Sequence, residues 1–450
     1  MDDGIFKAYD IRGLYPQELD AQASGAIGRG IARYLGGGPV VVGRDMRESG
    51  IELRASLTSG LRAEGVDVID IGRVSTPMVY FATNALDAEG GVMITASHNP
   101  GAYNGLKVCA REAVPIGGET GLADIAQHAR ELLSEPLPEP RGALRECDVA
   151  QRYYEELLDA FPVRPRLHAV IDAGNGIAGE AVEGLLERLP LEVTRLYFEP
   201  DGSFPNHEAN PLVLENIADL QRKVVECGAD LGIAFDGDGD RCAFIDERGQ
   251  AVPADLMTAL LAKTVLENRL LGAGPGTPIV YDLRSSRVVP ETLRAYGAVP
   301  VRGRVGHAFL KRTMRERGAC FAGELSGHFY FRFPSGYVAD DGAAAMMLGL
   351  QTMEIAGRPL SELWTPFQRY QQSGEINSRV DDVPATLARV RSHFSGGEVD
   401  ELDGLTVSFP DWWLNVRPSN TEPLLRLNVE AGSEAEMASR RDEVLAVIRG

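Results

Sequence analysis

Three aspartates at alternate positions carry the most distinctive chemistry in the chain. Asp236, Asp238 and Asp240 are separated by single glycines and followed by Arg241. This spacing places three carboxylates within reach of one cation, and hard oxygen ligands of this kind suit Mg²⁺, Mn²⁺ or Ca²⁺. An EF-hand calcium loop is the alternative because Glu247 falls at its twelfth position, but that loop needs glycine where Arg241 stands. We therefore predict a divalent-metal site formed by the three aspartates.

A serine is the second candidate for chemistry. Ser97 lies in the segment 95–100, Thr-Ala-Ser-His-Asn-Pro, directly after the apolar run 91–94. Because such a run is typical of a buried strand, we expect Ser97 at the carboxyl end of a sheet, where open α/β sheets bind ligands. His98 and Lys107 are close to it in sequence. Ser97 is therefore a candidate nucleophile, and a polar turn that caps a helix is the alternative.

A polar loop near the end of the chain is typical of an anion site. Arg417 opens it, and it lies between the apolar runs 412–416 and 424–429. Arginine can bind phosphate with two parallel hydrogen bonds, and hydroxyl, amide and backbone N–H groups can complete a cradle. These groups are supplied by Ser419, Asn420 and Thr421. A turn with a surface arginine is the alternative.

A third polar loop suits recognition of vicinal hydroxyl groups. Glu324, Ser326 and His328 occupy alternate positions, so we expect their side chains to point outward, although a turn or cap is the alternative. The segments 9–13 and 303–307 are weaker polar loops of the same kind. Together the loops supply a candidate nucleophilic serine, a metal site, a loop that can bind sugar hydroxyls (the sugar-reading loop) and a loop that can bind phosphate (the phosphate clamp). That combination predicts phosphoryl transfer to or from a sugar.

The elements that must position these loops repeat along the chain. An apolar run that ends in Asp occurs at 39–45, 168–172 and 278–282, and each is followed by a helical stretch and further apolar runs. Alternating strands and helices predict mostly parallel sheets covered by helices. In each copy a third strand leads into one of the polar loops. Chance similarity of short α/β segments is the alternative to a true repeat.

The repeat predicts an α/β protein of four domains around a central cleft. Three similar α/β domains with mixed, mostly parallel sheets are followed by a smaller C-terminal α+β domain. The Pro- and acid-rich stretch 131–140 is typical of a linker. We place the domains at 1–148 with the serine loop, 149–252 with the metal loop, 253–368 with the sugar-reading loop and 369–450 with the phosphate clamp.

The composition limits the partners and the compartment. The net charge of −20 disfavours nucleic acid and anionic membranes, although a local cluster of basic residues can still bind an anionic substrate. The five cysteines form no C-x-x-C pair, and the first residues do not resemble a signal peptide. No apolar run approaches 18 residues. We expect a cytoplasmic protein that binds neither nucleic acid nor membranes.

The loops in this order resemble the α-D-phosphohexomutase superfamily, and most closely its bacterial phosphomannomutase/phosphoglucomutase group. The resemblance implies that Ser97 carries a phosphoryl group and that one Mg²⁺ per chain is held by Asp236, Asp238, Asp240 and that phosphate. It implies exchange of hexose 1-phosphate and hexose 6-phosphate of glucose or mannose through a bisphosphate, with glucose 1,6-bisphosphate as activator. A monomer or weak dimer is expected. Arg284 stands where several dual-specificity members carry Lys, so the preferred sugar stays open.

The resemblance also implies roles for individual residues. Lys107 and His307 match positions that assist proton transfer. The catalytic positions are Ser97, His98, Lys107, Arg12, Arg241 and His307. The substrate-binding positions are Tyr9, Glu324, Ser326, His328, Arg417, Ser419, Asn420 and Thr421.

Three other functions remain as alternatives. A phosphoglucosamine mutase would carry Gln in place of Leu325 and Gly in place of Asn420. A serine hydrolase would use Ser97 and His98, but adjacent residues rarely reach the required hydrogen-bond geometry, and no G-x-S-x-G motif surrounds Ser97. A non-catalytic sugar-phosphate binding protein would need neither Ser97 nor the metal loop.

Overall fold

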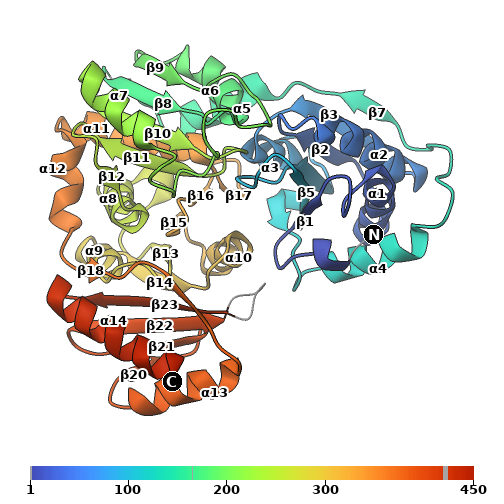
Figure 1. Ribbon diagram of the computed structural model, residues 1–450. Helices are drawn as coiled ribbons and strands as arrows, with labels where there is room; N and C mark the ends of the chain where they lie inside the picture. The colour runs from blue at the N-terminus through green and yellow to red at the C-terminus, as the bar shows by residue number, and fades with distance from the viewer. Residues whose placement is uncertain (1–2, 165, 419–423) are drawn as a thin grey trace.

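Four sheets, each with its own helices, follow one another along the chain (Figure 1). The computed structural model describes residues 3–164, 166–418 and 424–450. The first three sheets contain parallel and antiparallel pairs, whereas every pair in the fourth is antiparallel. The predicted fold class, three similar α/β domains and one α+β domain, is confirmed. The boundaries at 148, 252 and 368 stay predictions.

The first sheet has seven strands, in the order β1-β5-β4-β2-β3-β7, with β6 paired to β5. Its strands are β1 (Ile11–Leu14), β2 (Val40–Arg44), β3 (Val68–Arg73), β4 (Gly90–Ile94), β5 (Tyr103–Ala110), β6 (Val114–Pro115) and β7 (Leu144–Glu146). Its helices are α1 (Ala21–Leu35), α2 (Ser49–Ala63), α3 (Thr76–Ala85) and α4 (Leu122–Leu132). The predicted linker therefore begins inside α4, and β7 returns the chain to the edge of the sheet.

The second sheet has five strands in the order β12-β11-β10-β8-β9. Its strands are β8 (His168–Asp172), β9 (Glu192–Leu196), β10 (Leu231–Phe235), β11 (Cys242–Asp246) and β12 (Ala251–Val252). Its helices are α5 (Ala150–Ala160), α6 (Ala178–Leu186) and α7 (Ala218–Cys227). Because β11 follows the aspartate loop directly, the EF-hand alternative is wrong: a strand stands where a calcium loop would continue.

The third sheet also has five strands, in the order β14-β13-β15-β16-β17. Its strands are β13 (Pro278–Asp282), β14 (Val299–Gly303), β15 (Phe321–Gly323), β16 (Phe329–Arg332) and β17 (Val338–Asp340). Its helices are α8 (Ala254–Glu267), α9 (Val288–Ala295), α10 (His307–Arg317), α11 (Gly342–Ala356) and α12 (Leu360–Trp364).

The three sheets share one strand order, which confirms the repeat. In each, the first strand of the copy lies between the second and the third, and a fourth strand pairs antiparallel with the third. The third strands are β4, β10 and β15. They end just before Ser97, Asp236 and Glu324 respectively. The repeat thus delivers three different loops from equivalent positions.

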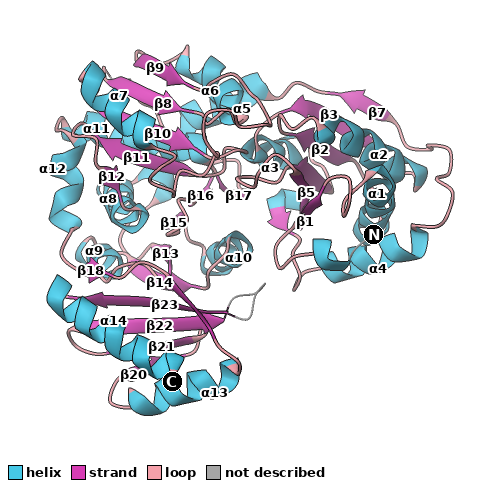
Figure 2. Cartoon of the chain, viewed as in Figure 1, coloured by secondary structure: helices cyan, strands magenta, loops and turns pink. Residues whose placement is uncertain are grey.

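The fourth domain is built differently. Its sheet contains β18 (Gln371–Gln372), β19 (Ile376–Arg379), β20 (Glu398–Asp400), β21 (Leu405–Ser408), β22 (Trp412–Pro418) and β23 (Leu424–Ala431). Helices α13 (Val383–His393) and α14 (Glu434–Arg449) lie together beside it (Figure 2). Its apolar side chains form a separate cluster, while one continuous core joins parts of the first three domains. The fourth domain therefore has a core of its own.

Local signals set several helix ends. The side chains of Asp20, Asp341, Asp382 and Ser433 accept hydrogen bonds from backbone N–H groups in the first turns of α1, α11, α13 and α14. Such caps satisfy donors that have no partner within the helix. Helix α1 ends at Gly36, whose φ of 76° is the left-handed conformation that glycine adopts without strain.

Candidate active site

Ser97 links the loop of the first domain to that of the second. Its hydroxyl donates a 2.8 Å hydrogen bond to Asp236 Oδ2, and its backbone N–H donates to Thr95 Oγ1 at 2.9 Å. Its φ of 50° is unusual for a residue other than glycine, and it is 2% exposed. Backbone strain of this kind persists where surrounding contacts hold it, often at functional sites. The loop is therefore held in one conformation with its hydroxyl against the aspartates.

A buried arginine that the sequence analysis did not single out donates hydrogen bonds to the backbone of this loop. Arg47 is 1% exposed, and its guanidinium donates to the carbonyl oxygens of Ser97 at 2.9 Å and Asn99 at 2.6 Å. It also donates to the carbonyls of Pro100 and Tyr103, and it pairs with the buried carboxylate of Asp45. The rigid fork of arginine suits several acceptors at once.

Replacing Arg47 with methionine is expected to destabilise the protein by about 3–5 kcal/mol, because it leaves the buried Asp45 carboxylate unpaired and several carbonyls without a donor. Denaturant unfolding measures this change. Arg222→Met is the control: Arg222 is an exposed residue of α7 that pairs with Asp219, and a surface pair contributes at most about 1 kcal/mol. Equal losses in the two variants would contradict the role of Arg47.

The three aspartates of the predicted metal site come together. Asp236, Asp238 and Asp240 are at most 1% exposed, and each offers an oxygen within 4.8 Å of the others. Burial and the neighbouring carboxylates raise the pKa of Asp236 well above its ordinary value. Asp238 Oδ1 is buried with no hydrogen-bond partner among the described residues. A buried oxygen without a donor and three crowded carboxylates fit a divalent cation.

The glycine between the first two aspartates is required by the close approach of the serine loop. A Cβ on Gly237 would lie 2.4 Å from the carbonyl oxygen of Ser97. A second bridge links the same domains, since the N–H and the hydroxyl of Thr76 donate to the backbone and side chain of Asp238. The first two domains thus meet through these two loops.

Lys107 reaches the metal loop from the first domain. Its Nζ donates to Asp238 Oδ2 at 2.6 Å and to Asp240 Oδ2 at 2.5 Å, and the side chain is buried. Although burial acts to lower the pKa of Lys107, Asp238 and the other aspartates outweigh it, and the pKa is raised. The guanidinium of Arg241 lies 3.6 Å from Asp236. Two cations therefore border the aspartates.

His98 and Arg12 surround the serine. The Nδ1 of His98 lies 3.2 Å from Ser97 Oγ, so these two neighbours reach the hydrogen-bond distance that adjacent residues rarely reach. Burial and the charges of Arg241 and Arg12 lower the pKa of His98 to about 2. Arg12 donates to Asn99 Oδ1 at 2.6 Å, which places a guanidinium beside the loop.

The sugar-reading loop of the third domain contacts the metal loop. The N–H of Cys242 donates to the carbonyl of Gly327 at 3.0 Å, and His328 Nε2 lies 3.2 Å from Asp240 Oδ1. His328 Nδ1 lies 2.7 Å from Ser326 Oγ. The loops of the second and third domains are thus joined through both backbone and side chains.

The predictions that His328 and Glu324 point outward are wrong: His328 is 7% exposed, and Glu324 is buried more deeply. The Glu324 side chain is 3% exposed and accepts hydrogen bonds from the Tyr330 hydroxyl at 2.5 Å and the Gly306 N–H at 3.1 Å. A buried carboxylate needs hydrogen-bond donors around it, and the third domain supplies them.

Tyr9 and His307 meet at the contact between the first and third domains. The Tyr9 hydroxyl donates to the carbonyl of Val305 at 3.1 Å, and the ring centroids of Tyr9 and His307 are 5.7 Å apart. The N–H of Val305 donates to Asp403 of the fourth domain at 3.1 Å. Burial and the charge of Glu324 raise the pKa of Tyr9. Loops of three domains therefore converge here.

Arg417 of the predicted clamp is buried at the end of β22. Its Nη2 donates to Glu375 Oε2 at 2.8 Å, and Glu375 also lies 3.4 Å from Arg284 of the third domain. Although burial acts to raise the pKa of Glu375, Arg417 and Arg284 outweigh it, and the pKa is lowered. The other predicted clamp residues, Ser419, Asn420 and Thr421, lie outside the described residues.

Sequence models of one family match all four domains. Residues 3–134, 151–249 and 253–370 match the alpha/beta/alpha domains I, II and III of phosphoglucomutase/phosphomannomutase, and residues 375–447 match its C-terminal domain. The chain belongs to the phosphoglucomutase/phosphomannomutase family. Its activity is that of a hexose-phosphate mutase, and the serine-hydrolase and binding-protein alternatives are not favoured.

Relatives of this phosphohexomutase match over nearly their whole length. The chain is 42% identical to a protein named phosphohexose mutases from Xanthomonas campestris, over 99% of each chain. It is 40% identical to a phosphomannomutase from Salmonella montevideo, over 98% of each. A crystal structure of a phosphoglucomutase/phosphomannomutase family protein from Burkholderia thailandensis has a TM-score of 0.90 and 34% identity, covering 100% of this chain and 98% of that one.

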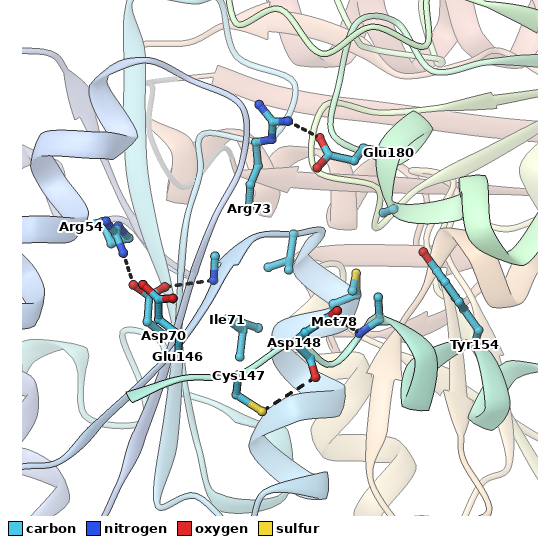
Figure 3. A pocket seen from close by; sticks show the side chains of 14 residues that line it. Arg54, Asp70, Ile71, Arg73, Met78, Glu146, Cys147, Asp148, Tyr154 and Glu180 are labelled. Carbon is cyan, nitrogen blue, oxygen red and sulfur yellow. Dashed lines mark hydrogen bonds and ion pairs between the residues drawn. The ribbon is translucent and has the colours of Figure 1, made fainter. Parts of the chain in front are cut away.

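A separate pocket of about 440 Å³ lies where the first two domains of the phosphohexomutase meet (Figure 3). Arg73 of the first domain pairs with Glu180 of the second at 2.8 Å, and Arg54 pairs with Asp70. The predicted site residues do not line it. We therefore assign this pocket no part in the reaction.

Proposed function

We propose that the protein interconverts hexose 1-phosphates and hexose 6-phosphates by passing a phosphoryl group through Ser97. The observation that carries this proposal is the 2.8 Å hydrogen bond from Ser97 Oγ to Asp236, one of three clustered carboxylates. Phosphoryl transfer depends mainly on positioning and on neutralising charge on the phosphoryl oxygens. A serine held beside a divalent-cation site meets both requirements.

We assign the cation to Asp236, Asp238, Asp240 and the phosphate carried by Ser97, and Mg²⁺ suits these hard oxygen ligands. When bound, the ion offsets negative charge on the transferring phosphoryl group. Lys107 and Arg241 border the same carboxylates and supply further positive charge.

Side chains of the site then transfer the proton and contact the phosphoryl group. The bond between phosphorus and Ser97 Oγ breaks as a bond to the free sugar hydroxyl forms. The hydroxyl proton passes to the neutral imidazole of His307, and the departing Ser97 Oγ takes a proton from the ammonium of Lys107. The resulting bisphosphate turns around and returns its other phosphoryl group to Ser97. Arg12 and His98 lie beside the serine loop and are placed to contact the phosphoryl oxygens.

Recognition of the sugar and of its second phosphate is assigned to the remaining loops. We assign the sugar hydroxyls to the loop that carries Glu324, Ser326 and His328, and Tyr9 lies at the same junction of domains. Arg417 binds the phosphate that does not react, together with Ser419, Asn420 and Thr421. Glucose 1,6-bisphosphate would restore the serine phosphate of enzyme that has lost it, and so act as an activator.

Parallel coupled assays with glucose, mannose and glucosamine 1-phosphates test the proposed function. We expect turnover of the glucose compound, the mannose compound or both. Intact mass should show about 80 Da of phosphate on the active enzyme, as the composition of a phosphoserine requires. Preference for glucosamine 1-phosphate would favour the alternative mutase. Tight binding without turnover of any of the three would contradict the proposal.

Arg417→Lys should raise the KM for hexose 1-phosphate and hexose 6-phosphate alike, by about tenfold, because lysine cannot copy the bidentate fork of arginine. One clamp and one carrier must serve both orientations of the sugar, so both substrates lose the same contact. Steady-state kinetics in both directions measure the change, and more bisphosphate should escape during turnover. Arg379→Lys, at an exposed position of β19, is the control. An effect on only one monophosphate would exclude a shared clamp.

We also propose a cytoplasmic location and a monomeric or weakly dimeric state. All five cysteines are free, which suits a reducing compartment. Among the helices that the structure describes, none combines the length and apolar character needed to cross a bilayer. Light scattering at several protein concentrations tests the oligomeric state.

A further inference from the structure

A fully buried ion pair lies under helix α10. Lys311 and Asp340 are both 0% exposed, and Lys311 Nζ donates to Asp340 Oδ1 at 2.8 Å. The same Nζ lies 4.2 Å from the ring centroid of Tyr80, which belongs to α3 of the first domain. A buried ion pair often stabilises a core no more than apolar residues of similar size would, because burying two charges is costly. The pair therefore calls for an explanation other than stability.

The second oxygen of Asp340 points to that explanation. Asp340 Oδ2 is buried with no hydrogen-bond partner among the described residues, and it lies 4.0 Å from His307 Nδ1, which also has none there. His307 begins α10, and Lys311 follows one turn later on the same face of the helix. A buried acceptor without a donor is costly, and a small rotation of the imidazole would satisfy both atoms.

Two neighbouring groups argue against a metal at this position. Asp340 lies within 4.8 Å of ligand atoms of Asp240 and His328. However, the ammonium of Lys311 already binds Asp340, and Asp240 is already assigned to the cation site that it forms with Asp236 and Asp238. The free oxygen of Asp340 is thus left to the histidine.

We propose that Asp340, held in place by Lys311, is a positioning residue that keeps the Nδ1–H of His307 directed at its carboxylate and leaves Nε2 free to exchange a proton with the sugar hydroxyl. The inference rests on the proposed function, in which His307 takes part in proton transfer. When Nε2 accepts the hydroxyl proton, the imidazolium faces the Asp340 carboxylate. Burial and the charges of Lys311 and Lys107 lower the pKa of His307, so the neutral ring accepts the proton and gives it up again in the return step.

Nitrogen NMR of protein labelled with ¹⁵N-histidine tests the tautomer directly. The chain has seven histidines, and His307→Gln identifies the signals of interest. We expect wild-type His307 to carry its proton on Nδ1, and Asp340→Asn to shift the population toward Nε2–H. Lys311→Met is a second way to disturb the His307 tautomer, because it removes the ammonium that holds Asp340 in place but keeps an apolar side chain of similar length. A wild-type His307 protonated mainly on Nε2 would overturn the proposal without any variant.

Kinetics separate positioning from a structural effect. Asp340→Asn should lower kcat about 10- to 100-fold, within the roughly 10²–10⁴-fold that a positioned acid or base supplies, with KM changed less than about threefold. Asp341→Asn is the matched control: Asp341 is equally buried, but it caps α11 and accepts from Tyr153, so the His307 tautomer should not change. An unchanged tautomer in Asp340→Asn would overturn the inference. Absence of mutase turnover in the wild type would instead count against the proposed function, and the tautomer would still report the Asp340–His307 contact.

Discussion

Ser97→Ala is expected to abolish covalent phosphorylation and to lower turnover by at least about 10³-fold, because no other group can carry the phosphoryl group between the two ends of the sugar. The structure supports this choice of carrier. The hydroxyl is buried against Asp236, and the strained backbone at Ser97 is held by Arg47 and Thr95. Phosphopeptide mapping of the active enzyme, with turnover measured in both directions, checks the result.

A second buried serine of the same domain provides the control for Ser97→Ala. Ser24 lies in α1 and donates to the carbonyl of Leu53 at 2.8 Å. Ser24→Ala should lose about 1 kcal/mol of stability, the contribution of an ordinary hydrogen bond, and retain both phosphate and activity. Phosphate found on another residue of the active enzyme would show that Ser97 is not the carrier.

Asp238→Asn is expected to weaken metal binding and to lower kcat by about 10²–10⁴-fold, because one carboxylate of the cation site is lost and the transition-state charge is offset less. The Oδ1 of this residue is buried and lacks a hydrogen-bond partner among the described residues. Calorimetric titration with Mg²⁺ and the dependence of activity on Mg²⁺ concentration measure the effect. Excess EDTA should likewise stop the wild-type enzyme.

Another buried aspartate separates metal binding from the general cost of removing a charge. Asp255 is 1% exposed and accepts from the N–H of Ser286, away from the metal loop. Asp255→Asn should leave Mg²⁺ affinity unchanged even where it lowers stability. Full wild-type activity in EDTA, or equal Mg²⁺ dependence in Asp238→Asn and the wild type, would exclude the proposed metal site.

Short-range patterns carried much of the information in the sequence. The aspartate loop could be predicted because ligands at alternate positions of one loop stay close whatever surrounds them. The position of Ser97 followed from a glycine-bounded apolar run, which is a strand in the structure. The repeat predicted three equivalent sheets because each copy repeats the same local order of strands and helices. These features depend on residues that are near one another in the chain.

Contacts between distant segments were decided by the tertiary structure alone. Arg47 binds the serine loop across 50 residues, Lys107 reaches Asp238 across 131, and Asp340 at the end of β17 faces His307 at the start of α10. Glu324 points inward because the Tyr330 hydroxyl and the Gly306 N–H donate hydrogen bonds to it, and no local sequence pattern predicts these contacts. The strength of a buried charge or hydrogen bond depends on what the packed domains place around it. A single sequence shows which side chains can react, whereas the docking of the domains determines which of them meet.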